Sequence, residues 1–243
     1  MMVDVTDAQP RITISYAQSL DGRIATITGS SRWISGGATL TLAHRLRRDS
    51  DAVLVGIGTV LADDPELTCR LDTNGNVAPS GGTIVSDETP SRIIVDSKLH
   101  LQSESRLAQT ANDIPTYVLC DSRHMGTDRA RNLEHLGLRL VGMTADGSGH
   151  FTPMQIVEWV VRTGFQTLLV EGGRQILTLF LRAGEVDRMV VVTAPIIIGE
   201  GISAIGDLGV TDLKDALRAD SVSTRRLGQD MVWDLRFHRE GRL

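Results

Sequence analysis

Short apolar runs rich in β-branched residues alternate along this chain with segments of helical periodicity. Eight runs bounded by turn residues predict strands, and five amphipathic segments predict helices. Strands that alternate with helices favour an α/β fold with a mostly parallel central sheet and helices on both faces. The last strand follows a long irregular tail and alternates more, so we expect it to be antiparallel. The predicted strands are residues 11–17, 52–57, 92–95, 116–119, 138–141, 167–170, 188–192 and 232–237, and the predicted helices are residues 37–49, 105–111, 128–135, 153–163 and 173–183.

The chain length fits one large domain. With 243 residues it can bury a sizeable core without disulfides or metals. We expect an N-terminal tail over residues 1–10 and a single domain over residues 11–243. The polar segment at residues 72–91 is either a variable surface loop or a flap over a site.

Composition excludes several classes of function. The net charge of −5 and the pI near 5.7 argue against a nucleic-acid partner. No apolar run approaches membrane-spanning length, and the acidic N-terminus lacks a signal-peptide core. The two cysteines form no C-x-x-C pair, and the six histidines show no ligand spacing. We therefore expect a cytoplasmic protein without a metal site.

One predicted strand ends in an acid and two glycines, Glu171-Gly172-Gly173, directly before a predicted helix. Free backbone N–H groups and the positive end of the helix dipole favour an anion at such a turn, and glycine lets a phosphate come close. A tight turn without a ligand explains the same pattern about as well, because the full G-x-G-x-x-G fingerprint is absent.

Four further segments carry polar residues at or beside the ends of predicted strands, and three of them also contain glycine. Each has a purely structural alternative: Asp21 suits a turn, Ser35 suits a helix N-cap, and residues 63–65 suit a helix stop. Ligands of open α/β sheets bind at the carboxyl ends of strands, which favours a shared site. The segments are residues 19–25, 31–35, 55–70 and 194–201.

Taken together and in order, these motifs resemble the pyrimidine reductases of riboflavin biosynthesis. The resemblance covers roughly residues 10–239. It implies a dihydrofolate-reductase-like fold and the NADPH-dependent reduction of a ribosylamino to a ribitylamino group on a pyrimidine 5′-phosphate. The residues that carry it are 19–23, 31–34, 58–60, 63–65, 92–97, 171–173 and 194–195.

Two departures from the family pattern bear on the substrate. Many bacterial relatives carry a zinc deaminase domain, but this chain has no P-C-x-x-C motif, so we expect another polypeptide to perform any deamination. Ser15 stands where relatives have Lys or Asn. The sequence therefore leaves open whether the deaminated or the undeaminated pyrimidine is preferred, and whether NADPH is preferred over NADH.

The resemblance also implies two sets of site residues. The implied cofactor residues are Ala17, Trp33, Thr59, Asp63, Ser97, Gly172, Gly173, Arg174, Gln175, Ile176 and Leu177, with the pyrophosphate at the helix N-terminus. The implied substrate residues are Ser31, Arg47, Leu67, Arg70 and Glu171. Guanidinium forks suit a substrate phosphate, which favours Arg47 and Arg70. Without the resemblance, Arg47 would be interpreted as a solvated helix residue.

Glu171 and Asp63 are the candidate catalytic residues. Glu171 ends an apolar strand, where burial could raise its pKa or direct it at ring N–H groups. The alternative is that it only caps the strand turn. Two other functions remain open: a reductase of the same fold acting on another heterocycle, and a non-enzymatic nucleotide-binding relative.

A homodimer is expected because relatives are commonly dimers and the apolar run at residues 189–198 carries few charges. The alternative for most of this run is a strand buried within one subunit.

Overall fold

The computed structural model describes residues 9–72, 74–77 and 89–238. A nine-stranded sheet in the order β10-β11-β8-β1-β7-β3-β4-β5-β6 forms its centre, and a small second sheet pairs β2 with β9. Pairing is parallel from β8 through to β6, and β11 and β10 are antiparallel. The strands are β1 (Arg11–Ser19), β2 (Arg23–Thr26), β3 (Ala52–Gly56), β4 (Ser91–Val95), β5 (Thr116–Asp121), β6 (Arg139–Met143), β7 (Thr167–Gly172), β8 (Arg188–Ala194), β9 (Gly201–Ser203), β10 (Ser221–Leu227) and β11 (Asp230–Arg236).

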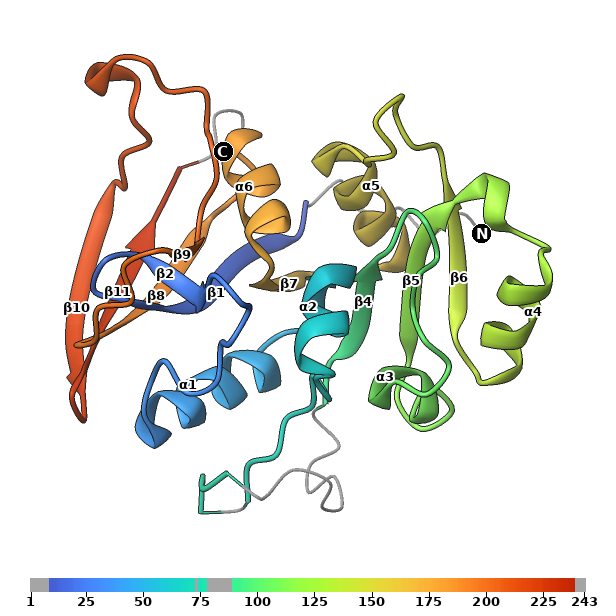
Figure 1. Ribbon diagram of the computed structural model, residues 1–243, viewed down its shortest axis with the longest axis horizontal. Helices are drawn as coiled ribbons and strands as arrows, with labels where there is room; N and C mark the ends of the chain where they lie inside the picture. The colour runs from blue at the N-terminus through green and yellow to red at the C-terminus, as the bar shows by residue number, and fades with distance from the viewer. Residues whose placement is uncertain (1–8, 73, 78–88, 239–243) are drawn as a thin grey trace, which may run out of the picture.

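Helices cover both faces of the large sheet (Figure 1). One hydrophobic cluster joins the sheet to α1, α3 and α4, and a second joins the opposite face to α5 and α6. Successive side chains of β7 pack in opposite clusters: Leu168 and Val170 pack in the second cluster, and Leu169 packs in the first. The helices are α1 (Gly37–Arg48), α2 (Ile57–Asp63), α3 (Arg106–Gln109), α4 (Asp128–His135), α5 (Pro153–Thr163) and α6 (Arg174–Arg182).

The predicted α/β fold with its mostly parallel sheet is confirmed. Each of the eight predicted strands overlaps a strand of the structure, and each of the five predicted helices overlaps a helix. At the start of α5 the Thr152 side chain caps the helix in a capping box with Gln155, and Pro153 occupies the first turn.

Three parts of the sequence prediction are wrong. The supposed irregular tail contains β10, whose exposed residues show no apolar alternation because it is an edge strand. The strand predicted at residues 52–57 ends at Gly56, and α2 begins at Ile57. Ser35 is not the N-cap of α1; that position is Gly36, and the distant Asp230 carboxylate accepts the Gly36 N–H at 2.8 Å.

Some expectations stay predictions. Most of the 1–10 tail and the centre of the 72–91 segment lie outside the described residues. Among the residues that the structure describes, no helix is long and apolar enough to cross a membrane. The cytoplasmic location and the division into a tail and one domain are not tested by this fold.

Candidate active site

The large sheet is split at the carboxyl end of β7. β1 pairs with β7 only from Arg11 to Ile14, and from Ser15 onward it pairs with β8 alone. On its other side β7 stays paired with β3, but with a register shift: Leu54 faces Val170, and Val55 faces Gly172. Glu171 is therefore the extra residue of a β-bulge, a device that redirects a side chain and is common beside active sites.

Glu171 forms a bidentate ion pair with Arg47 of α1. The guanidinium donates to both carboxylate oxygens, at 2.7 Å from Nε to Oε1 and 2.6 Å from Nη2 to Oε2. The third nitrogen donates to the Thr68 carbonyl at 3.2 Å. The two side chains are only 15% and 12% exposed. Arg47 is thus not the solvated helix residue that composition alone favours.

Electrostatics favour this pairing. Burial by itself would lower the pKa of the Arg47 guanidinium, but the Glu171 carboxylate raises it overall. Charge-assisted bidentate pairs are among the stronger protein hydrogen bonds and fix the geometry of both groups. Arg47 consequently holds the Glu171 carboxylate in one orientation at the edge of the split.

The glycine turn after Glu171 is open to a ligand. Gly172 and Gly173 have φ of 154° and 80°, and no side chain among the described residues caps the N-terminus of α6 at Gly173. A Cβ at Gly173 would lie 3.0 Å from Thr59 Oγ1. The turn therefore needs glycine at Gly173 and leaves the start of α6 able to accept an anion such as a pyrophosphate.

The segment before α1 forms another wall and is held at both ends. Ser31 Oγ donates to the Asp63 carboxylate at 2.7 Å, and the Arg32 guanidinium donates to the Asp63 carbonyl at 2.8 Å. At the far end, Asp230 binds the Gly36 N–H. Trp33, between these anchors, remains 79% exposed.

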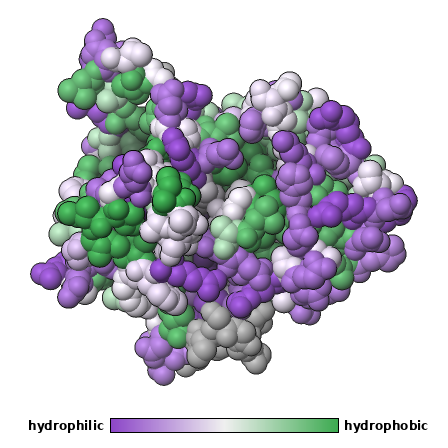
Figure 2. Space-filling view, viewed as in Figure 1, coloured by the Kyte–Doolittle hydropathy of each residue, from purple (hydrophilic) through white to green (hydrophobic). Residues whose placement is uncertain are grey.

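These elements enclose a cleft of about 880 Å³ along the carboxyl ends of β1, β7, β3 and β4. The surface is hollowed near the middle of the face seen in Figure 2. The cleft brings together all the residues expected on the cofactor side and two of those expected on the substrate side. These are Ala17, Ser31, Trp33, Thr59, Asp63, Ser97, Glu171, Gly172, Gly173, Arg174, Gln175, Ile176 and Leu177.

Arg47, Leu67 and Arg70 do not line this cleft. Leu67 is buried, and Arg70 pairs with Glu66 at 2.6 Å. The buried His44 accepts the Arg70 backbone N–H, and its pKa falls to about 4 through burial and the adjacent Arg47 and Arg70 guanidiniums. The two arginines thus lie outside the walls of the cleft, each paired with a carboxylate.

A smaller cavity of about 190 Å³ adjoins the cleft. The two spaces share Tyr16, Ala17, Trp33 and Glu171 in their walls, and Ser15 lines the smaller one. Burial raises the pKa of the Tyr16 phenol to about 12, so it stays protonated at neutral pH. Glu171 therefore stands between a large and a small compartment.

Sequence analysis missed several residues of the cleft. Tyr16 follows the apolar start of β1 and lines the cleft because β1 no longer pairs with β7 at this position. Lys98, His100 and His150 lie at the β4 end. The only sequence signal for them was that Lys98 directly follows Ser97 at a strand exit.

Asp21 has a structural role, as its turn position suggests. Its carboxylate accepts hydrogen bonds from Ser19 Oγ and from the backbone N–H groups of Ile198 and Gly199. These bonds lower its pKa to about 2. Within the described part of the chain, no group of three or more His, Cys, Asp or Glu side chains could hold a metal ion.

Open α/β sheets bind their ligands at the carboxyl ends of the strands, which is where this cleft lies. Residues 10–233 match the family model described as the RibD C-terminal domain. The chain belongs to this family.

Two relatives illustrate the match. The riboflavin biosynthesis protein RibD of Aquifex aeolicus is 36% identical over 228 residues, which cover 94% of this chain and 58% of that protein. The 2,5-diamino-6-ribosylamino-4(3H)-pyrimidinone 5′-phosphate reductase of Methanothermobacter thermautotrophicus is 33% identical over 227 residues, 92% of this chain and 96% of that protein. This chain therefore spans little more than half of the RibD relative but nearly all of the archaeal one.

Solved structures agree on the fold. RibD of Acinetobacter baumannii superposes with a TM-score of 0.76 at 24% identity, covering 95% of this chain and 59% of that one. The Saccharomyces cerevisiae riboflavin biosynthesis reductase gives a TM-score of 0.70 at 20% identity, covering 97% and 92%.

The ion pair between Arg47 and Glu171 generates a stability prediction. Removing one partner leaves a mostly buried charge uncompensated, so Arg47→Ala and Glu171→Ala should each lower the free energy of unfolding by about 3 kcal/mol. The double variant should lose clearly less than the sum. Urea denaturation of all four proteins measures the coupling.

The exposed pair Arg131–Asp128 on α4 is the matched control, and its coupling should stay below about 1 kcal/mol. Additive losses at Arg47 and Glu171 would contradict a coupled pair.

Proposed function

We propose that this chain is an NADPH-dependent reductase of riboflavin biosynthesis that converts the ribosylamino side chain of a pyrimidine 5′-phosphate to ribitylamino. The observation that carries the proposal is the junction at the end of β7, where a glycine turn suited to pyrophosphate directly follows a carboxylate facing a second cavity. The name of the archaeal relative, aligned over 96% of its length, supports the same reaction.

The cofactor would lie along the main cleft. The N–H groups at the start of α6 would bind its pyrophosphate beside Gly173, and the N-terminal dipole of the helix would favour the negative charge. Trp33 and Ala17 would flank the nicotinamide where the cleft meets the smaller cavity. When bound, the cofactor supplies hydride.

The substrate would lie in the smaller cavity. Glu171, oriented by Arg47, would accept N–H groups of the pyrimidine or handle the proton of the reaction. The ribose must open to an imine, whose carbon takes hydride and whose nitrogen takes a proton. Asp63, whose carboxylate accepts Ser31 Oγ in the main cleft, is the second candidate carboxylate.

Turnover tests the proposal directly. The purified chain should oxidise NADPH when given 5-amino-6-(5-phosphoribosylamino)uracil or its undeaminated diaminopyrimidinone counterpart, with loss of the reduced-nicotinamide absorbance. Glu171→Gln keeps size and hydrogen-bonding capacity but cannot exchange the proton, so turnover should fall about a hundredfold or more while NADPH affinity stays nearly unchanged.

Glu158→Gln, an exposed change on α5, is the control and should match the parent in turnover. Normal turnover with a lower melting temperature in Glu171→Gln would assign Glu171 to structure alone. NADPH binding without turnover of either pyrimidine would favour a non-enzymatic relative or a reductase for another heterocycle.

We also propose that the chain forms a homodimer. The valines of β8 are buried within the subunit, so they are not available to a partner. This agrees with the alternative given above for most of the apolar run at residues 189–198. The β10–β11 hairpin instead exposes Val222, Met231 and Trp233, and β10 is an edge strand of seven residues. Exposed apolar side chains beside a free sheet edge suit a self-complementary interface.

Light scattering at micromolar concentration should give the mass of two chains. Trp233→Ser should shift the protein toward the mass of one chain, because a large aromatic at an interface centre contributes strongly to binding. Met154→Ser on α5, also an exposed apolar residue, should leave the mass unchanged. A monomeric parent protein would refute the dimer.

A further inference from the structure

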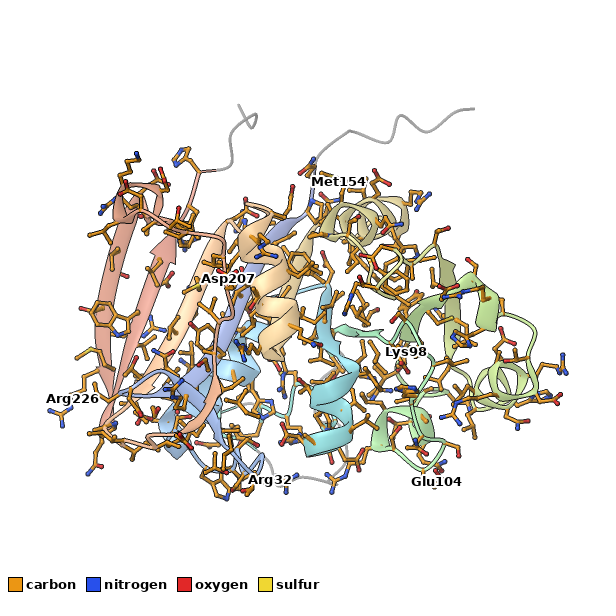
Figure 3. All side chains as sticks on the ribbon, turned by 45° about the horizontal axis from the view of Figure 1, so that its top comes forward. Arg32, Lys98, Glu104, Met154, Asp207 and Arg226 are labelled. Atoms are coloured by element: carbon orange, nitrogen blue, oxygen red, sulfur yellow. The ribbon has the colours of Figure 1, made fainter. Side chains whose placement is uncertain are left out.

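The carboxylate of Asp230 joins the C-terminal hairpin to the start of α1. Asp230 is 4% exposed, and its Oδ2 accepts the Gly36 N–H at 2.8 Å. Thr39 Oγ1 lies 3.2 Å from the same oxygen and donates to the Gly36 carbonyl at 2.6 Å. The two contacts join residues that are 194 and 191 positions apart in the sequence. In Figure 3, Arg226 beside the hairpin turn and Arg32 beside the segment before α1 lie on the same lower side of the view.

Strand pairing fixes the place of Asp230 on the hairpin. β11 pairs with β8 from Met231 onward, and Asp230 lies one residue before this ladder, opposite Leu227 of β10. Burial alternates along the start of β11, so Asp230 and Val232 face the protein interior, whereas Met231 and Trp233 face outward. Val232 and Leu227 pack in the first hydrophobic cluster, to which α1 also contributes. The hairpin therefore presents the Asp230 carboxylate to α1 from a packed and paired base.

The stretch that Asp230 holds is one wall of the smaller cavity. Trp33, Ser35 and Gly36 from this stretch line the cavity, together with Glu171. The stretch forms no helix or strand, so its course depends on the anchors at its two ends. Without the Asp230 carboxylate, this wall would lose its contact with the hairpin and keep the upstream hydrogen bonds to α2.

Helix capping alone does not require a carboxylate from the hairpin. The N-cap residue of α1, Gly36, makes no side-chain cap, and a local Ser or Thr at that position would satisfy the helix at a smaller desolvation cost than a buried carboxylate. A contact from the hairpin fixes something more. Val232, two residues after Asp230, is paired with Val192 of β8, and Val192 lines the smaller cavity. Asp230 therefore sets the position of the cavity wall at Gly36 relative to the strand that borders the same cavity.

We propose that Asp230 is a positioning residue for the reduction, which holds the wall at Trp33, Ser35 and Gly36 where the pyrimidine fits between it and Glu171. The hairpin thereby takes part in substrate binding without touching the substrate. This inference rests on the proposed function, which places the pyrimidine in the smaller cavity. Because the pyrophosphate of the cofactor would bind at the start of α6 and not at this wall, loss of Asp230 should affect the pyrimidine far more than NADPH.

Kinetics of Asp230 variants separate positioning from general stability. Asp230→Ala should lower kcat/KM for the pyrimidine 5′-phosphate by about tenfold or more, as expected when a hydrogen bond to a charged group is lost, and change the Kd of NADPH by less than about threefold. Asp230→Asn should recover most of the loss, because its amide oxygen still accepts the Gly36 N–H.

Asp234→Ala is the matched control on the same strand. It removes the ion pair with Arg188, in which Arg188 Nε donates to Asp234 Oδ1 at 2.8 Å. This variant should lower the melting temperature and leave both kcat/KM and the Kd of NADPH like those of the parent.

Fluorine NMR of the chain labelled with 5-fluorotryptophan follows the wall without turnover. The sequence has three tryptophans, Trp33, Trp159 and Trp233, and replacing each with Phe assigns its resonance. Asp230→Ala should move or broaden the Trp33 resonance and leave that of the core residue Trp159 unchanged, and Asp230→Asn should restore Trp33. Asp234→Ala should move the resonance of the adjacent Trp233 and not that of Trp33.

Asp230→Glu keeps the charge but displaces the carboxylate by one methylene, so it should move the Trp33 resonance even if Asp230→Ala does not fold. An unchanged Trp33 resonance in the folded Asp230 variants would overturn the inference. Parent-like kcat/KM in Asp230→Ala would also overturn it, as would a loss of NADPH affinity as large as the loss for the pyrimidine. If the parent turns over neither pyrimidine, the proposed function fails, whereas the Trp33 resonance still decides whether Asp230 positions this wall.

Discussion

β1 and β7 share four paired positions and then part near Glu171, where β7 also gains one residue against β3. This bulge turns a carboxylate toward α1 and leaves room between two strands that would otherwise be hydrogen-bonded. The cleft, the smaller cavity and the glycine turn all border that gap. A regular ladder here would place Glu171 opposite a β3 residue and close the space in which a ligand could contact it.

The two sides of the gap between β1 and β7 differ in which charged and N–H groups are already paired within the protein. Glu171 is fixed by Arg47, and the Asp230 carboxylate accepts the Gly36 N–H just before α1. The start of α6, by contrast, keeps its N–H groups free of any capping side chain in the described chain. An anionic dinucleotide would meet the N–H groups at the start of α6 within the cleft, with the Glu171 carboxylate beside them.

Much of this arrangement could be predicted from the sequence. The spacing of apolar residues indicates which faces of strands and helices are buried, and glycine indicates where the chain turns. The strand before Glu171, the Gly172–Gly173 turn and the helix behind it were all located in this way. The bulge was not, since it depends on how β7 pairs with β3, a contact between residues more than a hundred positions apart. For the same reason the contact of Asp230 with the Gly36 N–H and the place of Lys98 in the cleft wall had no local signal. The exposed edge strand β10 lacked the alternation by which strands are recognised.

A crystal structure of this chain with NADPH bound would test most directly whether the split beside β7 is a dinucleotide site. The pyrophosphate oxygens should accept hydrogen bonds from the backbone N–H groups at the start of α6, with the nicotinamide beside Glu171 and Tyr16 and the adenosine beside Ser97. A pyrophosphate bound away from α6, or a cofactor lying in the reverse direction with its nicotinamide at Ser97, would contradict the account.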